Sequence, residues 1–343
     1  MISAELLSAV ESGYNINLIG EPEVLTGGWW NEVFRLPTDS GALVLRVFHR
    51  QTKPENVVYQ HALTRFLVPK LAEVCAPLVA RDGSTFFQHN DRLVCLLPFM
   101  PGEIASRESA TERNSAAQVL ARLHCAALHF PANVPPSLYA PMPEFNWTSN
   151  DWWNWFEIRE LLAKGAEEII GLLPQSSEHS ILAAREIINR RMQIGEERRN
   201  FQKRFAEIKF TRRLLSAPTH GDFYAGNVLV VGGRVSAVID WDEARPDWLI
   251  YELARATWEF CRLKAEKNLD ENRAFDFLQS YTQAEGAVSP ADFDLLIEMM
   301  RAVRLQEVLF ALAETMRGEF FDLEYTLFNL LSLENLRGVK LSF

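Results

Sequence analysis

The first hundred residues alternate short apolar segments with turn residues. Four such segments lie at residues 33–36, 42–48, 84–88 and 93–99. Short runs of this kind, bounded by turn residues, are typical of β-strands. Residues 54–71 instead place their apolar side chains three and four positions apart, which is the spacing of an amphipathic helix. The pattern therefore predicts an N-terminal sheet with one long helix.

After Pro98 the apolar positions recur with a helical period as far as the C-terminus. The expected helical stretches are residues 108–128, 152–164, 177–205, 247–265, 271–284 and 289–337. A strand pattern returns once, where residues 227–231 and 235–239 flank Gly232-Gly233, a dipeptide that favours a hairpin turn. We therefore expect an α+β chain whose second, mostly helical lobe contains one β-hairpin.

Length and composition indicate a globular protein with about two domains. The chain has 343 residues, of which 48% are hydrophobic and 23% are charged. Its 45 acidic and 35 basic side chains give a net charge of −10, and the resulting field repels nucleic-acid backbones and anionic lipids. We therefore expect neither a nucleic-acid nor a membrane partner.

The sequence shows no membrane-spanning or secretory segment. No stretch approaches the run of about 20 apolar residues that a membrane helix needs, and the first residues lack the basic and apolar regions of a signal peptide. We expect a cytoplasmic protein whose four scattered cysteines are reduced core residues. The seven histidines form no ligand-like cluster, so any bound metal should have oxygen ligands.

Three polar residues around the predicted hairpin suggest phosphoryl transfer. Such a reaction needs a carboxylate that accepts the proton of the attacking hydroxyl, together with an amide and a second carboxylate that hold Mg²⁺ on the nucleotide phosphates. Asp222, Asn227 and Asp240 supply these groups in that order, and hard oxygen ligands suit Mg²⁺. Each residue alone is equally explained as a turn or cap residue. The ordered set with its hairpin favours the catalytic interpretation.

The same residues resemble the signature of the aminoglycoside phosphotransferase and choline kinase superfamily, which comprises small-molecule kinases with a protein-kinase-like fold. The resemblance rests on His220-Gly221-Asp222, Gly226-Asn227-Val228-Leu229 and Ile239-Asp240-Trp241. It implies a bilobed protein-kinase-like α+β fold and an enzyme that uses ATP and Mg²⁺. By this resemblance Asp222 is the catalytic base, Asn227 and Asp240 are the metal ligands, and His220 stabilises the loop.

The resemblance also implies how the chain is divided and where the nucleotide binds. Residues 1–97 would form the nucleotide-binding β lobe, residues 98–102 the hinge, and residues 103–343 the helical lobe with the catalytic loop and the acceptor-binding region. The glycine turn between the first strands would lie over the triphosphate, since glycines expose backbone N–H groups to phosphate. A plain hairpin turn explains these glycines as well. The implied nucleotide contacts are Gly27, Gly28 and Asn31 in the turn, and Pro98, Phe99 and Met100 in the hinge.

The phosphate-binding cation of the family corresponds here to Arg46. It is flanked by apolar residues on a predicted strand, and a buried arginine needs an anion such as a bound phosphate. Relatives often carry a glutamate on the long helix that pairs with this cation, but the matching residue here is Gln60. Glu55, over one turn earlier, is an alternative partner, so the ion pair of Arg46 stays open.

Two features favour a small-molecule hydroxyl as the phosphate acceptor. Gly221 stands where eukaryotic protein kinases carry the arginine that reads activation-loop phosphorylation, and the interval after Asp240 is too short for a long activation loop. Residues 145–156 contain four tryptophans and two phenylalanines, which either pack in the core or bind an acceptor ring or cation. Because the second lobe is acidic, we expect a cationic acceptor.

Two other functions remain open. A pseudokinase or nucleotide-binding module would account for Gln60 in place of the helix glutamate, although the intact polar set argues for catalysis. An atypical protein Ser/Thr kinase could use the basic helix at residues 185–213 as a docking surface, whereas such a charge run is more simply a solvated helix face.

Overall fold

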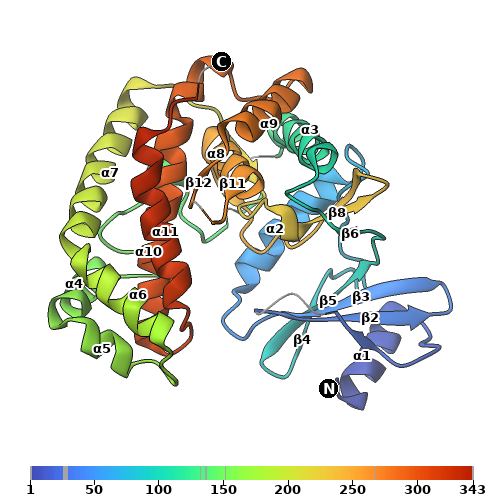
Figure 1. Cartoon of the computed structure of the whole chain (residues 1–343). Coiled ribbons are helices and arrows are strands. Elements are labelled where there is room, and N and C mark those ends of the chain that lie inside the picture. The colour runs from blue at the N-terminus through green and yellow to red at the C-terminus, as the bar shows by residue number, and fades with distance from the viewer. Residues whose placement is uncertain are drawn as a thin grey trace. The chain divides into compact units, whose positions relative to one another are not determined.

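A computed structural model of the protein describes residues 2–25, 30–131, 133–135, 137–150, 152–265 and 267–341. Gly27 and Gly28 lie outside these residues. The chain forms two compact units (Figure 1). The first comprises Met1–Leu138 and His220–Arg245, and the second comprises Tyr139–Thr219 and Pro246–Phe343. The predicted hinge at residues 98–102 lies inside the first unit, and the division into lobes on either side of it stays a prediction.

A five-stranded antiparallel sheet organises the first unit. Its strands follow the order β1-β2-β3-β5-β4, with bounds β1 (Glu23–Val24), β2 (Glu32–Thr38), β3 (Gly41–Val47), β4 (Phe87–His89) and β5 (Arg92–Pro98). β2 and β3 form a tight hairpin whose register pairs Phe34 with Leu45 and Val33 with Arg46. Side chains alternate between the two faces of a strand, so Arg46 lies on the face opposite to Leu45 and Val47.

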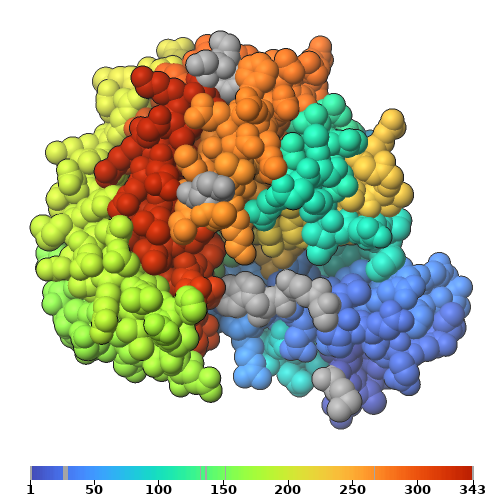
Figure 2. All heavy atoms as spheres, in the orientation of Figure 1, coloured from blue at the N-terminus to red at the C-terminus, as the bar shows by residue number. Residues whose placement is uncertain are grey.

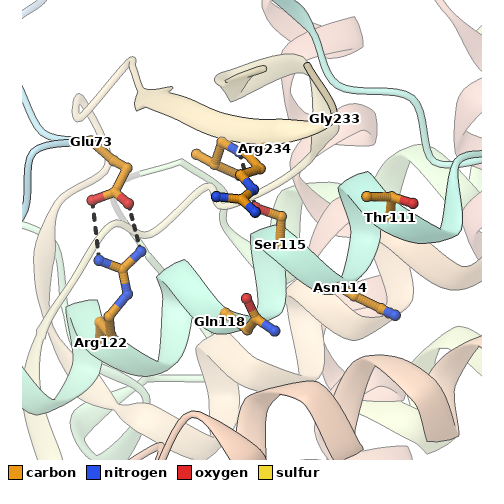
Figure 3. A pocket seen from close by; sticks show the side chains of 9 residues that line it. Glu73, Thr111, Asn114, Ser115, Gln118, Arg122, Gly233 and Arg234 are labelled. Carbon is orange, nitrogen blue, oxygen red and sulfur yellow. Dashed lines mark hydrogen bonds and ion pairs between the residues drawn. The ribbon is translucent and has the colours of Figure 1, made fainter. Parts of the chain in front are cut away.

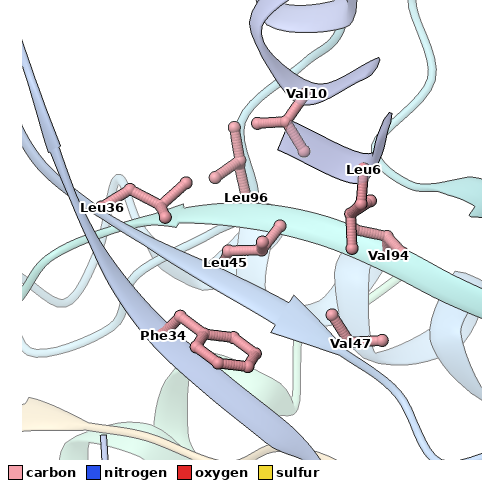
Figure 4. Packing of buried hydrophobic residues seen from close by; sticks show 8 residues of the cluster. All are labelled: Leu6, Val10, Phe34, Leu36, Leu45, Val47, Val94 and Leu96. Carbon is pink, nitrogen blue, oxygen red and sulfur yellow. The ribbon is translucent and has the colours of Figure 1, made fainter. Parts of the chain in front are cut away.

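Helix α1 (Ala4–Tyr14) covers the Leu45 face of this sheet (Figure 4). The buried cluster consists of Leu6, Val10, Phe34, Leu36, Leu45, Val47, Val94 and Leu96. Ser3 begins the helix by accepting a hydrogen bond from the Leu6 N–H at 3.2 Å. The sequence pattern did not predict this helix, because its buried stripe consists only of Leu6 and Val10 among polar and small residues.

Helix α2 (Pro54–Leu67) packs against the residue after β3 and against residues of β5. Val57 forms a second buried cluster with Phe48, Leu93 and Cys95. Pro54 begins the helix at a position where a missing N–H costs nothing. The helix ends at Leu67, one turn before the predicted end. In the same helix His61 is buried, and its Nδ1 lies 2.9 Å from Thr85 Oγ1.

The predicted hairpin is present and belongs to the first unit. Strands β8 (Val228–Val231) and β9 (Arg234–Val238) join β6 (Glu103–Ile104) in a three-stranded sheet next to α3 (Ala110–Ala127). Gly232 and Gly233 make its turn with φ values of 58° and 76°, which glycine adopts without strain. The Val238 N–H donates to the Glu73 carbonyl at 2.7 Å. This bond ties the hairpin to the segment that follows α2.

The second unit is mainly helical. Its helices are α4 (Trp155–Lys164), α5 (Ala166–Gly171), α6 (Glu178–Asn189), α7 (Arg191–Thr211), α8 (Leu249–Cys261), α9 (Glu271–Gln283), α10 (Leu296–Arg317) and α11 (Leu323–Asn335). Its short strands are β7 (Ser216–Thr219), β10 (Arg245–Trp248), β11 (Arg262–Leu263) and β12 (Asn268–Leu269). Helix α10 packs against α8 and α11 (Figure 1). Figure 2 shows residues of α11, in red, reaching the surface.

Two of the predicted helical stretches are divided into separate helices. The stretch at residues 177–205 breaks at Arg190, which lies outside helical geometry between α6 and α7. The stretch at 289–337 breaks at Gly318, whose φ of 79° ends α10 in the left-handed conformation common at helix C-termini. Apolar periodicity continues through both breaks, and for that reason it does not reveal them.

The aromatic segment at residues 145–156 is mostly part of the core. Trp147 is buried and stacks on Phe201 and Phe205 of α7, with ring centroids 5.4 Å and 5.8 Å away. Trp153 and Trp155 are also buried. The structure therefore favours core packing over ligand stacking for these three tryptophans.

Three of the four cysteines are buried. Cys75, Cys95 and Cys261 are buried, as expected of core residues, and Cys125 is partly exposed. Within the described ranges, no helix combines the length and the apolar character needed to cross a membrane.

The buried His61 makes stability depend on pH. Burial and the nearby charges of Arg46 and Arg65 lower its pKa from 6.5 to about 3. The unfolded chain binds a proton near pH 6.5 and the folded chain does not, so stability falls as pH drops from 6.5 toward 3. Between pH 7.5 and pH 5.0 the native protein should lose about 2 kcal/mol more than a His61→Asn variant.

Urea unfolding at both pH values measures this difference. His129→Asn is the matched control, because His129 is exposed. That variant should lose the same stability as the native protein. An equal loss in His61→Asn and native protein would contradict a neutral, buried His61.

Candidate active site

Arg46 connects the sheet with the end of the hairpin. Its Nη2 lies 2.5 Å from Oδ1 of Asp240 and 2.8 Å from Oδ2 of Asp242. The Arg46 side chain is only 11% exposed. The residue predicted to bind phosphate and a residue predicted to bind metal are thus in direct contact, although 194 positions separate them in the sequence.

The charges of this cluster shift one another's pKa. Burial alone would lower the pKa of Arg46, but the carboxylates of Asp242 and Asp240 raise it above its usual range. Burial would raise the pKa of Asp240, and the charge and hydrogen bond of Arg46 outweigh this and lower it. The pKa of Asp242 is raised, because burial and the charge of Asp240 outweigh the attraction of Arg46. Arg46 therefore stays charged and stabilises Asp240 as a carboxylate.

Asn31 holds Asp242 from the other side. Its Nδ2 donates to Asp242 Oδ2, and its Oδ1 accepts the His49 N–H at 2.9 Å. The ring of Trp30 contacts that of His49 in a tilted arrangement, with a centroid distance of 3.9 Å and an interplanar angle of 33°. Asn31 thus links the end of the glycine turn to the segment after β9.

The predicted catalytic loop is built around His220. The His220 ring is fully buried; its Nδ1 accepts the Asp222 N–H at 3.2 Å, and its Nε2 lies 2.9 Å from the carbonyl of Ile239. One ring therefore bridges the loop and the end of β9, in the loop-stabilising position that the sequence predicts. Gly221 has a φ of 85°, and a Cβ atom there would lie 2.1 Å from the Glu243 carbonyl oxygen. Only glycine fits this position.

Asn227 joins the catalytic loop to the predicted metal ligands. Its Nδ2 donates to the carbonyl and to Oδ2 of Asp222, both at 3.0 Å. The Ile239 N–H donates to the Asn227 carbonyl at 2.9 Å, which places Asp240 beside Asn227 across the hairpin. Asp240 has a left-handed φ of 62°, a strained conformation for a non-glycine residue, and its side chain is 43% exposed.

The donor set fits a magnesium ion that is shared with phosphate. Because Nδ2 of Asn227 is engaged by Asp222, the amide presents Oδ1 on its other side. Asp240 supplies carboxylate oxygens. In the part of the chain that the structure describes, no three His, Cys, Asp or Glu side chains form a metal cage. Magnesium commonly takes one or two protein oxygens together with substrate phosphates and water, so a partial donor set of this kind suits it.

The predicted hinge residues lie at the end of β5. Pro98 pairs with Leu43 of β3, and the Phe99 N–H donates to the Ala42 carbonyl at 3.3 Å. The guanidinium of Arg35 lies 5.1 Å from the centroid of the Phe99 ring. Phe99 is thus engaged in the sheet, and Met100 follows it half-buried. The adenine contacts assigned to these residues stay a prediction, as do those of Gly27 and Gly28.

A separate polar pocket lies between α3 and the hairpin (Figure 3). Its volume is about 540 Å³, and Arg122 and Glu73 form an ion pair at 2.5 Å in its wall. The described residues that line it are Glu73, Thr111, Asn114, Ser115, Gln118, Arg122, Gly233, Arg234 and Val235. No predicted site residue is among them.

Asp242 is the charged residue of the cluster that the sequence reasoning missed. The available signal was its position two residues after Asp240, close enough in the chain for both carboxylates to reach one cation. Its pairing with Arg46 and Asn31 depends on contacts across about 200 residues of sequence, which the local pattern does not contain.

Comparisons with known proteins agree with the signature. Residues 21–287 match the model of the phosphotransferase enzyme family. The chain is 26% identical over 281 residues to a homoserine kinase of Neisseria meningitidis serogroup B, which covers 82% of this chain and 79% of that protein. It is 25% identical over 316 residues to a homoserine kinase of a Caulobacter species, with coverage of 91% and 87%.

Solved structures share the fold. Spectinomycin phosphotransferase in complex with ADP and spectinomycin superimposes with a TM-score of 0.65 at 14% identity, covering 98% of both chains. The microcompartment-associated aminopropanol kinase gives a TM-score of 0.65 at 15% identity, covering 99% of this chain and 100% of that chain. The kinase-like α+β fold expected from the sequence is therefore confirmed. Because the family match spans well over half of the chain, this protein belongs to the phosphotransferase enzyme family.

Proposed function

We propose that this protein transfers the γ-phosphate of ATP to a hydroxyl group of a small, amine-bearing molecule with the help of Mg²⁺. The observation that carries the proposal is the pairing of Arg46 with Asp240 in a unit that also joins Asp222 to Asn227. A phosphate-binding cation, a metal-binding carboxylate, a metal-binding amide and a general base are the groups that this reaction requires.

In this proposal Asp222 orients the acceptor hydroxyl and takes its proton. Its carboxylate is fixed by the Asn227 amide, and its backbone is fixed by the His220 ring. Fixed donors of this kind hold a base in reacting geometry before the substrate arrives. The proton moves from the acceptor oxygen to an oxygen of Asp222 as that acceptor oxygen bonds to the γ-phosphorus, and the bond between this phosphorus and the oxygen of the departing ADP breaks.

Asn227 and Asp240 would hold Mg²⁺, which neutralises charge on the phosphates when it is bound. Arg46 would contact phosphate oxygens, and its buried position keeps the guanidinium poorly hydrated and therefore strongly attracted to anions. The nucleotide phosphates offer Arg46 a new anion, while the metal offers Asp240 a new cation. Each member of the pair thus gains a partner when both ligands bind.

The acceptor class follows from charge and from the relatives. The whole chain contains 45 acidic and 35 basic side chains, of which residues 1–100 contain 10 and 8. Residues 101–343 therefore contain 35 acidic and 27 basic side chains. A negative field attracts cationic substrates. Relatives named homoserine kinase and a structural neighbour named aminopropanol kinase are consistent with a small alcohol that carries an amine. Homoserine is the first acceptor to test.

Replacing the proposed base should stop turnover and spare nucleotide binding. Asp222→Asn should lower kcat at least about a hundredfold, because it removes one general base, and should leave the affinity for Mg·ATP within about threefold of the native value. Coupled ADP-release assays and calorimetry measure the two effects. Asp276→Asn, at an exposed position on α9, is the matched control and should behave as the native protein. Retained turnover in Asp222→Asn would disprove the role of this residue.

Replacing the proposed metal ligand should instead remove the metal dependence of nucleotide binding. Native protein should bind ATP at least about tenfold more tightly with Mg²⁺ than without it, and Asp240→Ala should lose most of that difference. Calorimetric titrations with ATP, in the presence of Mg²⁺ or of EDTA, measure it. If Asp240→Ala keeps the full metal effect, the metal lies elsewhere.

An acceptor panel tests the substrate class. We expect Mg·ATP-dependent ADP release with homoserine or with a short amino alcohol, and its loss in the Asp222→Asn variant. The panel should include choline, spectinomycin and a mixed protein substrate. Transfer only to protein would favour a protein kinase. ATP binding without transfer to any acceptor would favour a nucleotide-binding module.

A further inference from the structure

The two carboxylates that hold Arg46 are not equivalent. The Asp240 side chain is 43% exposed, while that of Asp242 is 19% exposed. Under the proposed function Asp240 turns to the metal, which weakens its hold on Arg46. Asp242 is the more buried of the two, so we expect it to be the carboxylate that stays with Arg46 when metal binds.

Asp242 is itself fixed in place. Oδ2, the oxygen that receives Arg46 at 2.8 Å, also accepts the Asn31 amide, and Asn31 is in turn anchored to the His49 N–H. The guanidinium and the amide thus converge on one oxygen atom. A carboxylate held from two sides keeps a long arginine side chain in one position at a lower entropic cost than a mobile carboxylate would.

Helix α2 offers Arg46 no carboxylate among the described residues. Glu55 is exposed, and Gln60 is 4% exposed and uncharged. Gln60 lies beside Asp242, and hydrogen bonding from its side-chain amide acts to lower the pKa of that carboxyl group. His61, the next residue, is neutral near pH 7, because burial and the charge of Arg46 lower its pKa to about 3. Among the described residues, the carboxylates that pair with Arg46 both lie in the segment after β9.

We propose that Asp242 is the positioning residue for the phosphate-binding Arg46, supplying from the segment after β9 the carboxylate that α2 lacks at Gln60. This inference rests on the proposed function. It explains why the long helix can carry an amide at this position while the nucleotide site stays intact. It also assigns to Asn31 the task of holding Asp242, in addition to its place beside the glycine turn.

Moving the charge from the loop to the helix tests the inference. Asp242→Asn should weaken Mg·ATP binding at least about tenfold, and the double variant Asp242→Asn with Gln60→Glu should recover to within about threefold of native affinity. Calorimetry with Mg·ATP measures both values and needs no acceptor. A double variant that is folded and binds no better than Asp242→Asn would overturn the proposal.

A second cycle shows whether Asp242 acts through Arg46. In an Arg46→Met background, Asp242→Asn should change Mg·ATP affinity less than about twofold, because the side chain that it positions is gone. The double variant contains neither Arg46 nor Asp242, so it buries no arginine that has lost this carboxylate partner. It therefore remains interpretable if Asp242→Asn alone fails to fold. A full tenfold effect in the Arg46→Met background would contradict the positioning role.

Metal titration separates positioning from metal binding. At saturating ATP, the Mg²⁺ concentration that gives half-maximal Mg²⁺ binding should be the same in Asp242→Asn as in the native protein. A large increase in this concentration would show that Asp242 is a metal ligand and would overturn the inference. Failure of the proposed function is seen in the native protein itself, which would then bind no Mg·ATP or would bind it without transferring phosphate to any acceptor. Native binding with equal binding by Asp242→Asn would leave the proposed function standing and disprove the role of Asp242.

Discussion

The structure of the first unit depends on one buried charge. Arg46 lies on a strand between apolar neighbours, and an unpaired guanidinium there would cost several kcal/mol of desolvation. Only Asp240 and Asp242, which follow β9, supply its carboxylate partners among the described residues. This pairing therefore fixes how the hairpin lies against the sheet, with the end of β9 facing β3. The same requirement that stabilises the fold brings together a cation and the carboxylate that we propose to bind metal.

The backbone near this pair adopts left-handed conformations at two positions. Asp240 adopts a left-handed φ of 62°, and Gly221 sits at 85° with no room for a side chain. Such conformations persist only when their surroundings fix them. Here the fixing groups are the buried His220 ring, which contacts both the loop and Ile239, and the bond between Ile239 and Asn227. A loop that is held at both ends can keep Asp222 and Asp240, the proposed base and metal ligand, in place without ligands bound.

The sequence alone predicted what depends on local pattern. The hairpin around Gly232-Gly233, most helices and the kinase-like fold were predicted, because periodicity, turn residues and the signature lie within short segments. Helix α1, the breaks at Arg190 and Gly318, and the role of Asp242 were not. Asp242 is a polar residue in a loop until Arg46 and Asn31, about 200 positions away, give it partners. Long-range pairing of charges leaves no periodic trace in a sequence.

The ion pair also constrains the order in which ligands can bind under the proposed function. Metal alone would draw Asp240 away and leave Arg46 with one carboxylate, while ATP alone would draw Arg46 toward the phosphates and leave Asp240 beside their negative charge. In either case, binding one ligand without the other leaves a buried charge without a full partner, and such a charge is costly where water is largely excluded. Mg·ATP completes both exchanges at once, because phosphate meets Arg46 as metal meets Asp240. Nucleotide and metal are therefore expected to bind together. Because Asp242 stays paired with Arg46, the guanidinium can contact phosphate and still keep one carboxylate partner.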